Sequence, residues 1–264
     1  MDLKQELDAW YKRINRQEFI LTDPVQFPRR YMDAADSRRQ EMYRQDVEVA
    51  AFLTAVIAWG RRENIIRSAE GLFARMGPSP FAFVMAGNYR KLQDRCIHRT
   101  FFEADLAYFC RGFRRCYKKY GSLESLFSSA LESPGSGIWD GIALFRETMA
   151  AGNNGLYTKH IANPAAHSAC KRINLALRWL VRREGPVDLG LWKSVSPAAL
   201  VIPLDLHVGR TARRLGLLER KSNDRKAVEE LTAKLRDFCP EDPAKYDLAL
   251  FGMGVGTAEF TPPL

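Results

Sequence analysis

Apolar residues recur at intervals of three and four along most of this chain, and this spacing constrains its fold more than any other feature. It is typical of amphipathic helices. The spacing covers residues 46–59, 64–75, 103–116, 122–131, 169–183, 205–218, 226–238 and 244–255. The best candidate for a strand, residues 201–206, is short and contains Pro203, and proline is confined to the edges of sheets. The sequence therefore predicts an all-α fold.

Glycine and proline mark the boundaries between the predicted helices. The run Gly-Pro-Ser-Pro at 77–80 ends one helix and begins the next, because glycine stops a helix and proline opens one. Residues 133–137 and 151–155 predict loops, and no internal repeat or low-complexity linker divides the chain. For 264 residues we expect one helical domain, 1–264, with two lobes. The first lobe covers roughly 46–160 and the second roughly 161–258, with the terminal helices packing back.

Composition excludes several classes of protein. Hydrophobic residues make up 46% and charged residues 27%, which is typical of a folded globular protein and not of a disordered chain. No apolar run approaches 18 residues, so no membrane span is expected, and the charged N-terminal segment does not resemble a secretory signal. Five scattered cysteines fit reduced thiols and lack the spacing of zinc or iron–sulfur ligands. We expect a cytoplasmic protein without a metal or other cofactor.

Basic residues are unevenly distributed. Forty Lys and Arg against 31 Asp and Glu give a net charge of +9. The segment 111–120 combines five basic residues with three aromatic ones and no acid, and a second basic group includes Arg210 and Arg213. Such groups suit the phosphate backbone of a nucleic acid. The alternative interpretation of each group is a solvated helix face.

Lys171 is the first candidate for a reactive side chain. The turn at Asn163–Pro164 predicts a helix with Ser168 as its N-cap and Lys171 in its first turn. The positive end of a helix dipole disfavours the ammonium form, as burial does, and a lysine that forms a Schiff base must attack as a neutral amine. An ordinary surface lysine is the alternative. Apolar residues on more than one face of this helix predict that it is central in the fold.

Asp205 is the second candidate. It follows an apolar segment, 200–202, and precedes a predicted helix. Aspartate is a favoured N-cap, so Asp205 is either a structural cap or an ionised carboxylate that faces a ligand. The neighbouring His207 suggests a metal pair, but no second cluster of His and Asp supports one.

Taken together, these two stretches resemble the helix-hairpin-helix (HhH-GPD) DNA glycosylase superfamily. The resemblance lies in a lysine at a helix start, an apolar approach, and then Asp205-x-His207-Val208-x-Arg210. Residues 54–83 are similar to the superfamily's N-terminal helices, with Trp59 where glutamine is common, and residues 226–258 are similar to its next two helices. The resemblance covers roughly 46–83 and 165–258. It implies a two-lobed helical fold in which Lys171 is the nucleophile and Asp205 the catalytic aspartate.

The chain departs from the superfamily's usual pattern at the hairpin. Residues 166–170 stand where Leu-Pro-Gly-Val-Gly is usual, so the hairpin is atypical and lacks the glycines whose neighbouring amides hold a DNA phosphate. Asp205 follows Lys171 at an interval of 34 residues, which is long and is filled by an extra loop at 183–195. Both departures are similar to the archaeal 8-oxoguanine DNA glycosylases. The C-terminal cysteine cluster of iron–sulfur members is absent, and Lys193 is the alternative nucleophile.

The resemblance implies a base-excision repair glycosylase with AP-lyase activity. It would flip an oxidised purine such as 8-oxoguanine out of double-stranded DNA, into a pocket between the lobes. The lysine would then attack C1′ of the sugar and form a Schiff base. The expected substrate-binding residues are Trp59, Arg61, Trp179, Trp192 and His207. The expected DNA-binding residues are Arg62, Arg111, Arg114, Arg115, Lys118, Arg172, Arg210 and Arg213.

We expect a nucleoid-associated monomer without an obligate protein partner or membrane contact. Three alternatives stay open at this point. The first is a catalytically inactive nucleic-acid-binding protein of the same fold. The second is an enzyme that uses Asp205 and His207 to bind a metal. The third is a helical scaffold for protein partners.

Overall fold

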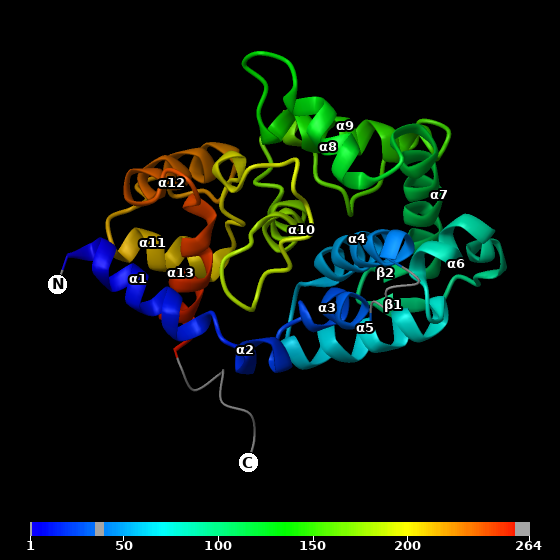
Figure 1. The fold of residues 1–264 in the computed structure, drawn as a ribbon, viewed down its shortest axis with the longest axis horizontal. Helices are drawn as coiled ribbons and strands as arrows, with labels where there is room; N and C mark the ends of the chain where they lie inside the picture. Colours follow the sequence, from blue (N-terminus) through cyan, green and yellow to red (C-terminus); the bar gives the residue numbers. More distant parts are fainter. Residues whose placement is uncertain (1, 35–39, 257–264) are drawn as a thin grey trace. The chain divides into compact units, whose positions relative to one another are not determined.

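The computed structural model describes residues 2–34 and 40–256, and within them the chain is mostly helical (Figure 1). In chain order the helices are α1 (Leu3–Ile14), α2 (Gln17–Thr22), α3 (Gln26–Asp33), α4 (Gln40–Ile57), α5 (Arg62–Met76), α6 (Pro80–Ala86), α7 (Glu103–Tyr120), α8 (Leu123–Leu131), α9 (Ile138–Ala151), α10 (Lys171–Val181), α11 (Leu206–Arg214), α12 (Arg225–Phe238) and α13 (Tyr246–Val255). Short 3-10 helices are η2 (Asn88–Lys91), η3 (Pro164–Ala166), η4 (Pro197–Ala199) and η5 (Pro243–Lys245). The prediction of an all-α fold class is confirmed.

Each of the eight stretches with helical spacing contains a helix. Other elements of the structure were not predicted from the sequence. The strand candidate at 201–206 is extended but unpaired, whereas β1 (Cys96–His98) and β2 (Phe101–Phe102) form a small antiparallel pair that was not predicted. Helix α9 was not predicted either. It contains Gly141, and a glycine in the sequence usually indicates a turn or the end of a helix. In the structure, a Cβ atom at this position would lie 2.7 Å from the ring of Phe127. The glycine therefore allows α8 and α9 to pack closely.

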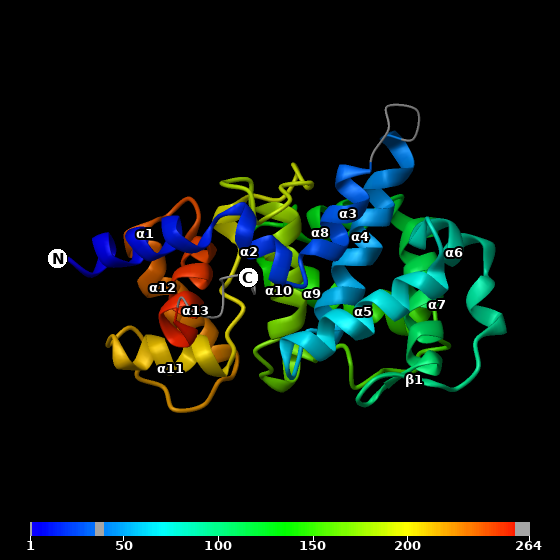
Figure 2. The same ribbon diagram turned by 90° about the horizontal axis from the view of Figure 1, so that it is seen from below.

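The chain divides into two compact units. Unit 1 combines the described residues up to Asp23 with those from Asn163 onward, and unit 2 is Pro24–Ala162. The first and last helices of the chain thus belong to the same unit, where α1 packs along α13 (Figure 2). A Cβ atom at Gly252 would lie 2.5 Å from Cγ1 of Ile14, so the missing side chain permits this close approach.

Helix α10 lies in the core of unit 1. Its apolar residues are buried on more than one face, as the sequence predicted, and they include Ile173, Leu177, Trp179 and Leu180. The chain that follows, from residue 182 to 205, contains no α-helix and only η4. This segment fills the long interval between Lys171 and Asp205.

Unit 2 is built around a cluster of aromatic rings. Phe52 of α4 stacks on Phe145 of α9 with ring centroids 4.8 Å apart, and Phe113 of α7 and Phe127 of α8 complete the cluster. A buried carboxylate on α4, that of Glu48, accepts hydrogen bonds from the first two amides of α8. The aromatic cluster and this cap fix the helices of unit 2 against one another.

None of the helices in the described part of the chain has the length and apolar character of a membrane-spanning segment.

Candidate active site

Lys171 is the first residue of α10, and a left-handed turn precedes it. Cys170 is the N-cap, with φ 47° and ψ 35°, and its carbonyl accepts from the amide of Asn174 at 3.0 Å. The prediction that Ser168 is the N-cap is therefore wrong. A capping side chain must reach an amide two or three residues later inside the helix, but the Ser168 hydroxyl accepts from the amide of Cys170, 3.2 Å away, which still lies outside the helix.

Asn174 holds this turn in place. Its side-chain amide donates to the carbonyl of Ala169 at 3.0 Å, while its backbone amide closes the first turn of the helix. The side chain is almost fully buried. An asparagine between the apolar residues Ile173 and Leu175 was the only signal of this role in the sequence.

Asp205 is the N-cap of α11, and its two carboxylate oxygens have different neighbours. Oδ1 accepts from the amide of Val208 at 2.9 Å, which is the capping bond. Oδ2 lies 3.7 Å from Nζ of Lys171. The two side chains are 30% and 22% exposed, so solvent or a ligand can reach the pair. Asp205 is therefore the structural cap that the sequence allowed, and its second carboxylate oxygen lies beside Lys171; that this oxygen faces a ligand stays a prediction.

Three consecutive residues, 223–225, link the segment before Lys171 to Asp205. The side chain of Asn223 donates to the carbonyl of Asp205 at 2.9 Å. Asp224 forms a β-bridge with Ser168, and the amide of Arg225 donates to the carbonyl of His167 at 2.9 Å. The start of α12 thus holds both the segment before Lys171 and the start of α11. Asp224 is also the N-cap of α12, and its link to residue 168 had no sequence signal.

Most backbone amides of the segment before Lys171 donate hydrogen bonds to acceptors within the same segment. Those of Ala165, Ala166 and Ser168 all donate to Asn163, and that of His167 donates to Pro164. The Cys170 amide donates to Ser168. These five amides are therefore engaged inside the segment, in contrast to the hairpin amides that hold a phosphate in the superfamily that the sequence resembles.

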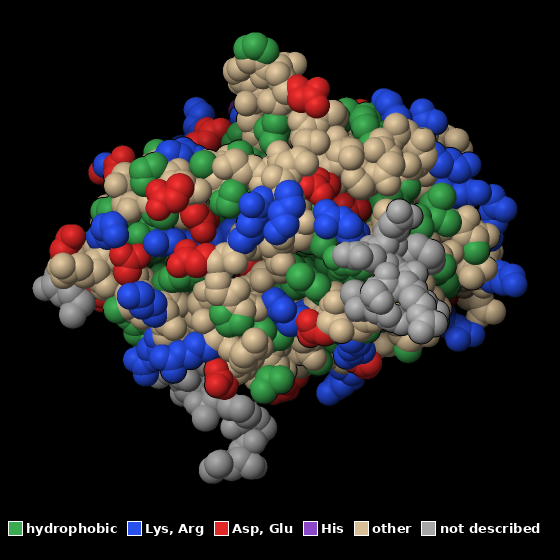
Figure 3. All heavy atoms as spheres, viewed as in Figure 1, with side chains coloured by type: hydrophobic (Ala, Val, Ile, Leu, Met, Phe, Trp, Pro, Cys, Tyr) green, Lys and Arg blue, Asp and Glu red, His purple; other side chains and the backbone are tan. Residues whose placement is uncertain are grey.

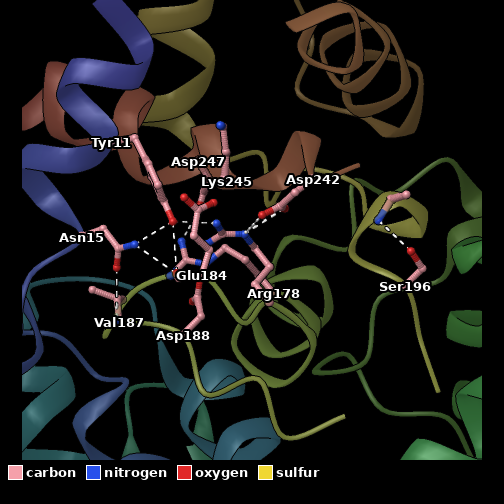
Figure 4. Close-up of polar contacts among 12 residues, drawn as sticks. Tyr11, Asn15, Arg178, Glu184, Val187, Asp188, Ser196, Asp242, Lys245 and Asp247 are labelled. Atoms are coloured by element: carbon pink, nitrogen blue, oxygen red, sulfur yellow. Dashed lines mark hydrogen bonds and ion pairs between the residues drawn. The ribbon is translucent and has the colours of Figure 1, made fainter. Parts of the chain in front are cut away.

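A buried network of arginines and aspartates surrounds Arg178 of α10 (Figure 4). Arg178 is paired with Asp188 and Asp247. Arg182 is paired with Asp188 and Asp242, and it also donates to the hydroxyl of Tyr11, which lies on α1, at 3.0 Å. Sequence analysis did not identify any of these residues.

Asp247 connects this network electrostatically to the pair at the surface. Burial raises the pKa of Asp247 to about 6, against the lowering effect of Arg178. The charge of Asp205 raises this pKa further and that of Lys171 lowers it. Asp247 is therefore sensitive to both members of the candidate pair.

The tryptophans predicted to bind a base lie in different environments. Trp179 is 1% exposed and Trp192 is fully buried. Both are core residues of unit 1 and present no ring face to a ligand, because close packing of an apolar interior surrounds a large indole on all sides. Trp59 belongs to unit 2, where the guanidinium of Arg99 covers its ring at 4.6 Å and the ring of His98 packs edge-on.

The remaining predicted residues of unit 1 lie near the start of α10 and along α11. His207 and Arg210 are exposed, and the ring of His207 packs against Phe251. Arg213 is engaged by the carbonyl of Arg220 at 2.8 Å and by other acceptors in the same loop. Arg172, beside Lys171, is half-buried, and this burial lowers its pKa.

Other predicted basic residues lie in unit 2, where Lys and Arg gather over the edge formed by α6 and α7 (Figure 3). Arg115 and Lys118 on α7 are exposed, and Arg114 is half-buried. Arg111 is exposed, but its Nε donates to the side-chain oxygen of Asn153 at 2.7 Å. Arg61 and Arg62 stand at the start of α5; the first is exposed and the second is half-buried.

Lys193 and Lys171 differ in their neighbours. The amine of Lys193 donates to the carbonyl of Gly190 at 2.7 Å, whereas the amine of Lys171 lies beside Asp205. Across residues 2–34 and 40–256, no three His, Cys, Asp or Glu side chains gather into a candidate metal site. The geometry thus brings together a lysine, an aspartate and the buried network behind them.

No curated protein and no solved structure is significantly similar to this chain. The model of one family, DUF2400, described as a protein of unknown function, matches residues 23–256 and therefore includes Lys171, Asp205 and Asp247. Because this match covers well over half of its residues, the chain belongs to the DUF2400 family.

Proposed function

We propose that this protein is a DNA glycosylase with AP-lyase activity, with the HhH-GPD fold and an atypical hairpin, that removes an oxidised purine such as 8-oxoguanine. The observation that carries the proposal is the Lys171–Asp205 pair. The two residues stand at the starts of two helices, their side chains approach to 3.7 Å, and both are partly exposed. Schiff-base chemistry requires a lysine amine that a sugar carbon can reach, and a carboxylate beside it can stabilise the positive charge that develops on the sugar.

Lys171 would supply the nucleophile. Its amine nitrogen forms a bond to C1′ of the nucleotide while the bond from C1′ to the base breaks, and the base departs with the electron pair and takes up a proton. The C1′–O4′ bond of the sugar then breaks, O4′ takes up a proton, and the nitrogen lone pair forms the protonated imine with C1′. Removal of a proton from C2′ breaks the C3′–O bond and expels the 3′ phosphate, which is the lyase step.

Asp205 would act through its charge. Positive charge develops on the sugar ring as the base departs, and a fixed carboxylate at the reacting carbon stabilises it without reorganisation. The capping bond from Val208 and the support of Asn223 hold this carboxylate in place. Because both contacts come from the protein itself, the orientation of Asp205 does not depend on the substrate.

The second candidate function is DNA binding without catalysis by a protein of the same fold. The observation that favours it is the segment 163–170, in which the five amides of residues 165–168 and 170 are engaged internally and so are not offered to a phosphate. Binding would then depend on side chains such as Arg210 and the exposed basic residues of α7. This candidate predicts affinity that falls with salt but no turnover.

Borohydride trapping tests the proposal. The protein is incubated with a duplex that contains 8-oxoguanine, and with a duplex that contains an abasic site, and borohydride reduces any imine to a stable adduct. We expect an adduct with the wild type and with Lys193→Ala, and none with Lys171→Ala. The matched lysine variant controls for a general loss of positive charge.

Two results would count against this assignment. An adduct that survives in Lys171→Ala and disappears in Lys193→Ala would move the nucleophile to the alternative lysine. Salt-dependent binding of both duplexes without any adduct would favour the DNA-binding candidate.

A further inference from the structure

The turn that follows α9 in unit 2 presents two large apolar side chains to solvent. Leu156 is 69% exposed and Tyr157, the next residue, is 51% exposed. Single apolar residues are common on protein surfaces and need no explanation. An adjacent pair on a well-held turn is different, because the fold then fixes both side chains where little of their apolar surface is removed from water.

Hydrogen bonds hold the backbone of this turn. The side chain of Asn153 donates to the carbonyls of Tyr108 and Met149, at 3.0 and 2.8 Å. The amide of Leu156 donates to the carbonyl of Asn153 at 3.0 Å, and the hydroxyl of Tyr108 donates to the carbonyl of Leu156 at 2.9 Å. The exposure of the two apolar side chains is therefore a property of the turn itself.

The ring of Tyr157 is fixed as well. The guanidinium carbon of Arg146 lies 3.7 Å from the centroid of the ring, and the Tyr157 hydroxyl donates to Oε2 of Glu147 at 2.6 Å. Arg146 and Glu147 are themselves paired at 3.4 Å. One face and the hydroxyl of the ring are thus engaged, while half of the side chain stays exposed. A ring held in this way loses little rotamer freedom when a flat group packs on its open face.

One side of α7 continues from this turn as a row of basic residues. The members of that side are Tyr108, Arg111, Arg115 and Lys118, at intervals of three, four and three. The first two bond to the turn, since Arg111 donates to the side chain of Asn153 at 2.7 Å. The last two are exposed, and beyond its first turn α7 carries no acidic residue. A polyanion that lies along this row would therefore meet the apolar pair at one end.

We propose that the turn and the basic row of α7 form a binding site for unpaired nucleotides. Leu156 and the open face of Tyr157 pack on the faces of the bases, and Arg115 and Lys118 pair with the phosphates. Aromatic side chains next to a basic track hold single-stranded nucleic acids in this way, with little dependence on sequence. An intact duplex offers base faces only at its ends, because its bases are stacked on one another.

This inference rests on the proposed function for its class of partner, a nucleic acid. It adds a site in unit 2 that uses neither Lys171 nor Asp205. The basic row is what favours a nucleic acid over a protein partner, because an apolar protein surface would not require positive charge beside the two exposed side chains.

Binding to three dye-labelled DNA probes tests the site: a single strand, a duplex with a single-stranded gap, and an intact duplex. In Tyr157→Ser, fluorescence anisotropy should show an affinity for the first two probes that is lower by about 5- to 150-fold, the effect of one stacked base. Affinity for the intact duplex should not change. Leu156→Ser should act in the same direction, and Tyr157→Phe, which keeps the ring, should retain wild-type affinity. Leu21→Ser in unit 1, which removes another exposed leucine, is the matched control and should change nothing.

The salt dependence of single-strand binding separates stacking from charge. Tyr157→Ser removes no charge, so the slope of log K against log salt concentration should stay as in the wild type while the affinity falls. Arg115→Ser removes one phosphate contact and should reduce the slope by about 0.7. A changed slope in Tyr157→Ser would overturn the proposal, because the ring would then act through the basic residues and not through the bases.

Three further results would overturn the proposal. The first is an equal loss of affinity for the single strand and the intact duplex in Tyr157→Ser, because a general loss of binding needs no base contact. The second is unchanged affinity for every probe in both Tyr157→Ser and Leu156→Ser, which would leave the apolar pair to a protein partner. The third is a wild type that binds none of the probes.

The proposed function fails in a different way. If the wild type forms no borohydride adduct but loses single-strand affinity in Tyr157→Ser, the glycosylase activity is refuted and the binding site in unit 2 is supported. If the wild type forms the adduct and the affinities of the Tyr157 and Leu156 variants match its own, the activity stands and the site is refuted.

Discussion

Arg178 on α10 and Arg182, the C-cap residue one turn later, share a single carboxylate, that of Asp188. Each also has a carboxylate of its own, Asp247 for Arg178 and Asp242 for Arg182. These residues come from three segments of unit 1, so their ion pairs connect α10 with the loop after it and with the C-terminal region. Removing one member of a buried pair leaves an uncompensated charge, which makes this network a sensitive point of the fold.

Replacing Arg178 should destabilise the protein strongly. Arg178→Met leaves Asp247 without its ion-pair partner and Asp188 with only one, so the free energy of unfolding should fall by about 3 to 5 kcal/mol. Urea denaturation at pH 7 measures this change. The control is Arg225→Met, which removes an exposed pair with Glu229 and should cost no more than about 1 kcal/mol. Similar losses in the two variants would show that the buried network contributes no more than a surface pair.

Asp247 should make stability depend on pH in a specific direction. Because its pKa is raised to about 6 in the folded state, the folded protein binds a proton that the unfolded chain has already lost between about pH 4 and pH 6. This contribution to stability is fully present below about pH 4 and is lost as the pH rises through 6. Asp247→Asn should therefore flatten the curve of unfolding free energy over that interval by up to about 3 kcal/mol. Unchanged slopes in denaturation series at several pH values would contradict the assignment.

Two substitutions of Asp205 should separate its capping role from its charge. Asparagine is as good an N-cap as aspartate, so Asp205→Asn should keep the free energy of unfolding within about 1 kcal/mol. The same variant should slow borohydride trapping by about 10²- to 10³-fold, because the carboxylate charge beside Lys171 is lost. Asp205→Ala loses the cap as well and should be about 1 kcal/mol less stable than Asp205→Asn. Full trapping activity in Asp205→Asn would reduce Asp205 to a structural cap.

Replacing exposed basic residues of α7 should change how steeply DNA binding depends on salt concentration. If Arg115 and Lys118 each neutralise one phosphate, the double variant to serine should reduce the slope of log K against log salt concentration by about 2. The control replaces Lys226 and Lys234, exposed lysines of α12, in the same way. Arg111→Ala should act on stability instead, because its side chain is bonded to Asn153. Equal changes of slope in the α7 and α12 variants would indicate a general effect of charge and not a binding surface.

The sequence by itself determined the helices that have regular apolar spacing and the two ends of the candidate site. Helical spacing is a local property, because residues three and four apart share a face whatever the rest of the chain does. For this reason each stretch with that spacing contains a helix in the structure. Lys171 and Asp205 were recognisable because a helix start is also a local feature, marked by turns and capping residues.

Only the tertiary structure decided what surrounds those two residues. The partners of Arg178 and Arg182 in the C-terminal region, Asp247 and Asp242, stand 69 and 60 residues later in the sequence, and no spacing rule connects groups so far apart. The same holds for the N-cap at Cys170, which depends on the bonds from residues 224 and 225 that hold the preceding turn. The burial of Trp179 and Trp192 was also decided by the tertiary structure, since an indole in the sequence fits a core as well as a binding site. Which charges meet, and which rings are covered, is set by how the helices pack, because burial and ion pairing depend on groups that come together only when the chain folds.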